Sequence, residues 1–421
     1  MTDVVDVVIV GAGLAGLACA QDLTAAGVEC RVLEGSDGVG GRVRTDAVDG
    51  FLLDRGFQIL LTAYPEVQRR LDLDALDLGL FEPGALVRVD QRFHRVGDPL
   101  RRPSQIPKTI AAPIGTLADK LRLARLIVDV RTHSVPHLLR RPDSTTADRL
   151  ARAGFSNRMI NSFWRPLFAG IQLDPDLVVS SRRFEVILRM LAVGPTGVPR
   201  LGMGEIPAQL ASMLPHGTVR LAARVVGIDG SSVTLEGGEQ VRARVVVVAT
   251  EGPAAHVLLG GDVIDPGSRS AACCWFAAPS TPLAGPVLIL DGDASGPATN
   301  VAVMSEVAPS YAPAGRALIA AAIPGPAALD PTVTAATREQ LARWFGSMTA
   351  DWEHLRTDVI HHGQPLQAPP FNPKQHVALG EGRFVCGDHR DTASIQGAMF
   401  SGRRTATAVK QHLRGPTEPP T

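Results

Sequence analysis

The stretch that decides the fold is Val4-Val5-Asp6-Val7-Val8-Ile9-Val10-Gly11-Ala12-Gly13-Leu14-Ala15-Gly16, near the start of the chain. Its first part is rich in β-branched residues, which predicts a strand buried on both faces. A helical pattern follows through Ala26, and residues 28–33 form a second strand pattern that ends at Glu34. The whole is a βαβ unit with G-x-G-x-x-G at its first turn, an arrangement typical of dinucleotide binding.

The glycines and the acid of this unit have separate physical roles. Gly11 allows the tight turn, Gly13 lets backbone N–H groups approach a pyrophosphate, and Gly16 lets the helix pack closely on the strand. The pyrophosphate then lies at the positive end of the helix dipole. Glu34 is placed to accept hydrogen bonds from an adenosine ribose, and its charge would repel the 2′-phosphate of NADP.

A second glycine-rich turn, Gly40-Gly41-Arg42, follows a few residues further on. It supplies more backbone donors and an arginine that can bind phosphate oxygens. Alone, this turn would fit a surface loop with a solvated arginine equally well. Because it follows the first motif, however, the sequence resembles the FAD-binding oxidoreductases of the flavin amine oxidase and carotenoid desaturase superfamily. In that family this second turn holds the FAD pyrophosphate.

The resemblance extends along most of the chain. Residues 54–65 are similar to the segment of plant-type carotene desaturases that passes beside the flavin ring, and residues 219–228 contain the strand that contacts adenine in the family. Residues 383–388 and 394–402 resemble the closing motif, where an acid contacts the ribityl chain and a helix N-terminus faces the flavin pyrimidine. The cofactor-binding residues that this resemblance implies are Gly11, Gly13, Leu14, Ala15, Gly16, Glu34, Gly40, Gly41, Arg42, Gly56, Phe57, Val225, Gly387, Asp388, Ile395, Gly397 and Ala398.

The resemblance also implies an α/β fold, with a discontinuous Rossmann-like FAD-binding lobe and an inserted α+β substrate-binding lobe. A length of 421 residues, two to three times that of a usual domain, agrees with two lobes. The FAD lobe is expected to comprise residues 1–85, 196–270 and 375–412, and the substrate lobe residues 86–195 and 271–374. The Pro-rich residues 413–421 are predicted to form a flexible tail.

Composition excludes several other classes of protein. Forty-two Lys and Arg balance 42 Asp and Glu, so no net charge attracts nucleic acid. The five cysteines include no C-x-x-C pair, and the pair His361-His362 lacks a third ligand, so neither a disulfide framework nor a metal site is expected. The N-terminus lacks the basic segment of a signal peptide, which favours a cytoplasmic protein. The uncharged run 271–290 contains three prolines, and we interpret it as two buried strands around a turn rather than a membrane span.

The substrate lobe carries fewer motifs. Residues 86–152 hold fourteen Arg or Lys against six Asp, a net of +8, and residues 117–130 form an amphipathic helical pattern. The apolar side chains of that pattern are Leu117, Leu121, Ala124, Ile127 and Val128. Three interpretations stay open: peripheral contact with an anionic membrane, attraction of an anionic substrate, or a solvated helix face. Three aromatic side chains further on either line an apolar substrate pocket or belong to the core: Phe163, Trp164 and Phe168.

Several departures from the family bear on the reaction. Residues 365–382 contain no cysteine for covalent flavin attachment, so FAD is expected to be bound non-covalently. The paired tyrosines that cage an amine are missing, since Ser394 stands beside the closing motif, and no lysine occurs between Lys120 and Lys374. Gln58 stands where the plant-type desaturases have a histidine. These departures weaken ordinary amine oxidation and leave the substrate open.

The sequence therefore predicts an FAD-dependent oxidoreductase that transfers a hydride from a largely apolar molecule to flavin N5. Dehydrogenation of a C–C bond in an isoprenoid-type molecule is the first expectation, with amine (C–N) oxidation and porphyrinogen oxidation as alternatives. A binding protein that escorts prenylated GTPases shares this fold, but the intact motif residues oppose it. A second G-x-G-x-x-G for a nicotinamide is missing, so the electron acceptor is expected to be oxygen, a quinone or another carrier. Arg55 and Gln58 are the candidates for the flavin face, and no acid or base is identified.

Overall fold

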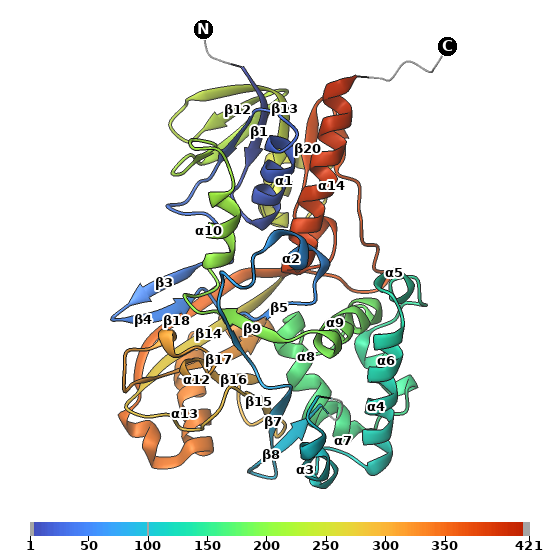
Figure 1. Cartoon of the computed structure of the whole chain (residues 1–421), viewed down its shortest axis with the longest axis vertical. Coiled ribbons are helices and arrows are strands. Elements are labelled where there is room, and N and C mark those ends of the chain that lie inside the picture. The colour runs from blue at the N-terminus through green and yellow to red at the C-terminus, as the bar shows by residue number, and fades with distance from the viewer. Residues whose placement is uncertain (1–3, 99–100, 416–421) are drawn as a thin grey trace.

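The computed structural model of the protein describes residues 4–98 and 101–415, which form two lobes built on two large sheets (Figure 1). The first lobe contains an eight-stranded sheet in the order β10-β2-β1-β13-β12-β11, with β20 pairing with β13 and β19 with β20. Its strands are β1 (Val5–Val10), β2 (Cys30–Leu33), β10 (Val219–Arg220), β11 (Val225–Asp229), β12 (Ser232–Leu235), β13 (Gln240–Val248), β19 (Ala378–Gly380) and β20 (Arg383–Val385).

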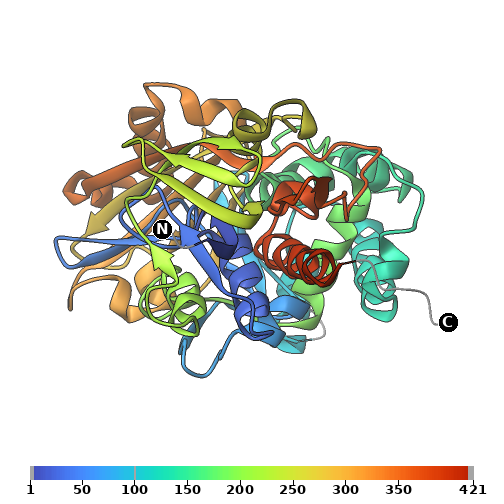
Figure 2. The same ribbon diagram turned by 90° about the horizontal axis from the view of Figure 1, so that it is seen from above.

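The centre of this sheet is parallel, as expected for a dinucleotide-binding fold. Val10 at the end of β1 lies between Leu33 of β2 and Val248 of β13, so three strands end at the same edge. The helices of the first lobe are α1 (Leu14–Thr24), α2 (Pro65–Arg70), α10 (Glu205–Ser212), α11 (Gly252–Leu259) and α14 (Ile395–Arg414). Helices α1 and α14 run side by side in both views (Figures 1 and 2). Gly402 permits this approach, because a Cβ there would lie 2.2 Å from the carbonyl oxygen of Ala15.

The second lobe is built on a seven-stranded sheet in the order β18-β14-β17-β16-β15-β7-β8. Its strands are β7 (Gly84–Val89), β8 (Arg92–Gly97), β14 (Ser268–Ala278), β15 (Leu288–Asp291), β16 (Asn300–Val303), β17 (Ala317–Pro324) and β18 (Glu353–Pro365). Its helices are α3 (Ile106–Ala111), α4 (Leu117–Thr132), α5 (Val135–Leu138), α6 (Thr146–Arg152), α7 (Asn157–Met159), α8 (Arg165–Gln172), α9 (Ser181–Val193), α12 (Met304–Val307) and α13 (Val333–Phe345). A π-helical turn, Ile160–Trp164, joins α7 to α8.

Two small sheets lie between the lobes. One pairs β3 (Thr45–Val48) with β4 (Phe51–Asp54), and the other has the order β5-β9-β6. The strands of the second are β5 (Leu60–Leu61), β6 (Leu78–Leu80) and β9 (Thr196–Pro199). Each large sheet draws its strands from separate stretches of the chain, and β7 and β14 begin two and three residues before the boundaries expected at residues 86 and 271.

The run 271–290 contains parts of two buried strands, as expected, and β14 pairs with β17 and β18, while β15 pairs with β16 and β7. The structure corrects two other expectations about local structure. The predicted tail at 413–421 begins too early, because α14 continues to Arg414, and residues 416–421 lie outside the described residues. Within residues 4–98 and 101–415, no helix has both the length and the apolar composition needed to cross a bilayer.

The second correction concerns the face of α4 that is buried. The predicted apolar residues Leu117, Leu121 and Val128 are exposed, and the side chains that pack into the lobe are Leu123, Leu126 and Val130. Ala124 and Ile127 are half-buried. Because the helix carries apolar side chains on more than one face, periodicity alone could not select the face that the rest of the lobe covers.

Candidate cofactor and substrate site

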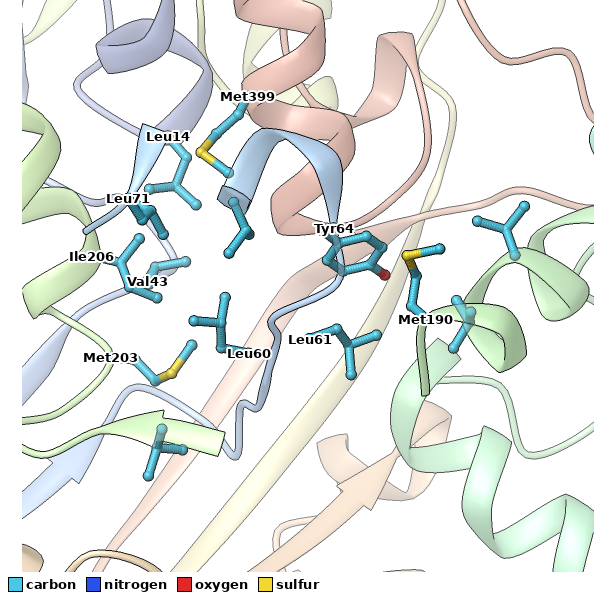
Figure 3. Close-up of a cluster of buried hydrophobic side chains, with 14 of the residues drawn as sticks. Leu14, Val43, Leu60, Leu61, Tyr64, Leu71, Met190, Met203, Ile206 and Met399 are labelled. Atoms are coloured by element: carbon cyan, nitrogen blue, oxygen red, sulfur yellow. The ribbon is translucent and has the colours of Figure 1, made fainter. Parts of the chain in front are cut away.

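A cavity of about 1150 Å³ lies where the two lobes meet. Both lobes contribute to the hydrophobic core around it, including Leu14 of α1, Tyr64 before α2, Met190 of α9 and Met399 of α14 (Figure 3). One half of the cavity is lined by the glycine turns and the closing motif, and we call it the cradle. The other half is lined by helices of the second lobe, and we call it the wall.

The first glycine turn of the cradle is shaped by the end of β1. Gly11 has φ +105°, and its N–H donates to the carbonyl of Leu33 at 2.8 Å. Gly16 is closed in, since a Cβ there would lie 2.1 Å from the carbonyl oxygen of Gly11. Gly13 has the opposite environment, with no atom within 4 Å of the position that its Cβ would occupy. Helix α1 begins directly after Gly13, so its positive end faces this open space, which suits a pyrophosphate.

Glu34 is held firmly at the end of β2. Its Oε2 accepts from the N–H of Ala12 at 2.7 Å, and its Oε1 accepts from the N–H of Ser36 at 2.9 Å. The side chain also borders the cavity. Each carboxylate oxygen keeps further acceptor capacity, so Glu34 presents a fixed group of hydrogen-bond acceptors to the cavity.

The second glycine turn packs against the first. The N–H of Gly40 donates to the carbonyl of Ala12 at 2.8 Å, and Gly13 and Gly40 form an isolated parallel bridge. Gly40 needs to be glycine, because its φ is +112° and a Cβ there would lie 2.2 Å from the carbonyl oxygen of Val43. The two turns therefore form one backbone surface of the size and polarity that a dinucleotide pyrophosphate requires.

Arg42 links these turns to the closing motif. Its Nη2 donates to Oδ1 of Asp388 at 2.7 Å, and its Nη1 donates to the carbonyl of Gly363 at 2.7 Å. Burial opposes the charge of Asp388, but the guanidinium outweighs it and holds the pKa of the carboxyl below its usual value. A phosphate oxygen would have to share the donors of Arg42 with these two acceptors. The role that the structure gives Arg42 is thus to fix Asp388 in its ionised form.

The closing motif ends the cradle at the start of α14. The N–H of Gly387 donates to Oγ of Ser401, and Oγ of Ser394 accepts from the N–H of Gly397, which caps the helix. Gly397 is packed tightly, since a Cβ there would lie 1.8 Å from the carbonyl oxygen of Thr392. The remaining donors of the first turn include the N–H of Ile395, which borders the cavity. Such a helix N-terminus suits the pyrimidine oxygen of a flavin.

The structure places most of the predicted site residues along this one cavity. Those that line it are Gly11, Gly13, Leu14, Ala15, Glu34, Gly40, Gly41, Arg42, Arg55, Gly56, Phe57, Gln58, Phe163, Trp164, Val225, Gly387, Asp388, Ile395 and Ala398. Gly16 and Gly397 lie behind the lining and serve helix packing. Phe168 is also behind it, fully buried against Trp164 and Phe184 in an aromatic cluster.

The two candidates for the flavin face are engaged with the protein itself. Arg55 forms a two-bond ion pair with Asp46, with Nε–Oδ2 and Nη2–Oδ1 distances of 3.1 and 3.0 Å. Gln58 donates from Nε2 to the carbonyls of Arg42 and Arg55. Both side chains therefore position the second glycine turn and the segment that follows it.

The wall is apolar, and its helices present Leu123, Ile127, Leu167, Ile171 and Leu191 to the cavity. Phe163 and Trp164 reach the cavity from the π-helical turn, an irregularity that often occurs at functional sites.

Sequence patterns gave no sign of one further residue of the wall, Arg183 on α9. Its side chain is 2% exposed and borders the cavity, and its Nη2 donates to Oε1 of Gln364 and the carbonyl of Ala393. Its Nε and Nη1 have no hydrogen-bond partner. Burial lowers the pKa of Arg183 to about 10, which still leaves it charged near neutrality. An arginine in the first turn of a helix is normally expected to be exposed to solvent. The burial of Arg183 could therefore be recognised only from the tertiary packing.

A buried carboxylate beneath the cradle ties the lobes together. Oδ1 of Asp54 accepts from Oγ1 of Thr45 at 2.5 Å and from the N–H of Met203 at 2.9 Å. Its Oδ2 accepts from the hydroxyl of Tyr311 at 2.8 Å. Burial raises the pKa of Asp54 to about 6, although these donors oppose the shift. In the part of the chain that the structure describes, no three His, Cys, Asp or Glu side chains come together as a metal site.

Known proteins with similar sequences include several oxidases. A putative flavin-containing monoamine oxidase of Mycobacterium tuberculosis is 58% identical over 52 residues, 12% of each chain. A putrescine oxidase of Kocuria rosea is 45% identical over 75 residues, 18% of this chain and 15% of the other. A coproporphyrinogen III oxidase of Propionibacterium freudenreichii is 27% identical over 189 residues, 42% of this chain and 34% of the other. The matched stretches thus span about a third or less of these relatives.

Solved structures share the whole architecture. An oxidoreductase from Methanosarcina mazei superposes with a TM-score of 0.75 at 19% identity, over 96% of this chain and 100% of the other. A putative protoporphyrinogen oxidase from Exiguobacterium has a TM-score of 0.70 at 16% identity, over 98% and 100%. At these identities the likeness shows the fold alone. Residues 14–410, however, match the model of the flavin containing amine oxidoreductases, and so the chain belongs to that family and is an FAD-dependent oxidoreductase.

Proposed function

We propose that this oxidoreductase dehydrogenates a C–C bond in a largely apolar, isoprenoid-type molecule. When bound, FAD would supply a two-electron acceptor for the hydride of one carbon; the neighbouring carbon releases a proton to water, and a C=C bond forms. The chain's own contribution is to hold the cofactor in the cradle and to orient the substrate against the apolar wall.

The observation that supports this proposal is the composition of the wall. Leucine, isoleucine and aromatic side chains line it, and the charged group among them that lacks a full set of partners is the Arg183 cation. An ammonium group would be repelled by this cation, whereas a neutral molecule or one with an acidic oxygen would not. The wall therefore favours an apolar substrate over an amine, and an oxygen acceptor on that substrate would satisfy Arg183.

A substrate panel tests the reaction. The purified holoenzyme is mixed anaerobically with polyenes, amines and porphyrinogens, and the bleaching of the flavin band is recorded. We expect bleaching by isoprenoid-type polyenes. Bleaching by amines or by porphyrinogens alone would make C–N oxidation or porphyrinogen oxidation the function instead. Reoxidation with oxygen and with a soluble quinone then identifies the electron acceptor, which we propose is one of these two.

Non-covalent binding of FAD is part of the proposal. All five cysteines are buried, and Cys386 next to the closing motif is fully enclosed, so no thiol reaches the cavity. Buried, unpaired cysteines also fit a reducing compartment, and we propose the cytoplasm. Acid precipitation of the protein is expected to release yellow flavin into the supernatant. Flavin that stays in the pellet would show a covalent bond.

A further inference from the structure

A group of large apolar side chains points away from the second lobe. It lies on α3 and α4, at the end of the molecule opposite β1 and α14 (Figure 1). We call it the α3–α4 surface, and it consists of Ile106, Ile110, Leu117, Leu121 and Val128. Leu121 is 66% exposed and Leu117 is 60% exposed. Covering these side chains would remove apolar area from water, which is energetically favourable.

This surface is the outer side of a helix that already has a buried side. Leu123, Leu126 and Val130 of α4 pack into the lobe, and Leu123 and Ile127 border the cavity. Helix α4 is therefore apolar on two faces, and nothing in the described residues covers the second. A surface helix that serves one core needs a single apolar face.

The fully exposed charges beside the α3–α4 surface are cations, namely Arg102, Lys108 and Arg125. Two acids of α4 are engaged within the protein. Asp119 is fully buried and accepts hydrogen bonds from Thr116 and Ser156, and the partly exposed Asp129 is paired with Arg141. The surface thus combines apolar side chains with exposed cations.

We propose that the α3–α4 surface docks on the anionic face of a lipid bilayer. The apolar side chains enter the boundary between head groups and acyl chains, and the three cations contact lipid phosphates. Docking of this kind requires both features together, and the neutral chain as a whole supplies no other attraction to lipid. It would also bring the outer side of α4 to the membrane while its inner side borders the cavity.

The proposal depends on exposed side chains and their charges, so it stands whichever bond the enzyme oxidises. Two exposed residues of the first lobe provide matched controls. Val257 and Ile264 are 80% and 83% exposed, more than any member of the α3–α4 surface, and acidic Asp262 and Asp265 lie near them in sequence. If exposed apolar area alone caused binding, these residues would contribute as much as Leu121.

The test is flotation of the FAD-loaded, full-length protein with phosphatidylcholine vesicles, prepared with and without phosphatidylglycerol. We expect binding to the anionic vesicles that weakens as salt is raised. Leu121→Glu should reduce the binding at least tenfold, and the double variant Lys108→Gln, Arg125→Gln should remove the preference for phosphatidylglycerol. Ile264→Glu should bind like the unmodified protein, and it is preferred to a Val257 variant because Val257 borders the cavity. Flavin content and circular dichroism confirm that each variant is folded.

Three results would overturn the proposal. The unmodified protein could fail to bind anionic vesicles, Leu121→Glu could bind them as well as the unmodified protein does, or Ile264→Glu could lose binding equally. Sedimentation velocity without lipid tests whether a second copy of the chain binds to the α3–α4 surface instead. Self-association that Leu121→Glu abolishes, without any vesicle binding, would assign the surface to a dimer contact instead.

Discussion

The cradle and the wall are two halves of one cavity, but different parts of the chain build them. The cradle is made of backbone, and its shape demands glycine where φ is positive or where a Cβ has no space, as at Gly11 and Gly40. The wall is made of side chains on α4, α8 and α9, where any apolar residue of similar volume would serve. A site made of backbone therefore leaves a strict pattern in the sequence, whereas a site made of side chains leaves almost none.

The prediction with the largest expected effect compares substitutions at two glycines of the same turn. Gly13 has φ −71° and open space around its Cβ position, so Gly13→Val should fold normally but fill the place of the pyrophosphate. We expect FAD affinity to fall about 100-fold or more, close to 3 kcal/mol at 1.4 kcal/mol per factor of ten. Gly16→Ala should instead lower the free energy of unfolding of the apoprotein by about 3 kcal/mol, because its Cβ meets Gly11.

Flavin titration and urea unfolding of the two apoproteins separate these effects. A Gly13→Val protein that purifies with full flavin would show that the open space beside α1 is not the pyrophosphate site.

A substitution of Asp54 tests whether the region beneath the cradle tolerates change as poorly as the cradle itself does. Its pKa of about 6 in the folded protein exceeds the usual carboxyl value, so the folded state holds the proton more tightly than the unfolded state. Its contribution to the free energy of unfolding is therefore greatest below pH 4 and decreases as the pH rises to 6, by about 3 kcal/mol in total. Urea unfolding of the unmodified protein and Asp54→Asn across pH 4–7 should show this difference, and parallel curves would contradict it.

A substitution of Glu34 tests a side chain on which the cradle depends. Because its carboxylate binds two backbone N–H groups and faces the ribose position, Glu34→Ala should weaken FAD binding by about 1.5–3 kcal/mol. Glu34→Gln keeps the shape of the side chain and should retain more of the affinity. Fluorescence titration with FAD measures both, and equal affinity in Glu34→Ala and the unmodified protein would remove the assigned role.

Arg183 gives the smallest expected effect and sharpens the description of the wall. Arg183→Leu should keep FAD but bind phenylacetate about tenfold more weakly, with little change for phenylacetamide, because a charge-assisted hydrogen bond is lost. Perturbation of the flavin absorbance measures both probes without turnover, and Arg220→Leu serves as a control, because Arg220 lies outside the cavity lining and is paired with Glu239. A shifted flavin reduction potential with unchanged selectivity would assign Arg183 to the cofactor.

The cradle could be predicted from the sequence, whereas much of the second lobe could not. The glycine turns, Glu34 and the α1 helix were located because their spacing encodes backbone geometry. The exposed face of α4 and the burial of Arg183 were missed, since both depend on which elements of the second lobe pack together. The bond between Arg42 and Asp388 was also missed, because it joins residues far apart in the sequence that are adjacent only in the fold.

That last bond has a consequence for synthesis of the protein in the cell. The glycine turns and Glu34 leave the ribosome long before Asp388, which follows Arg42 by 346 residues, and before α14. β13, the central partner of β1, is made between them. A growing polypeptide therefore has only part of its cradle until α14 has been made. Flavin is expected to bind only after that point, and polypeptides from premature stop codons before α14 should accumulate colourless.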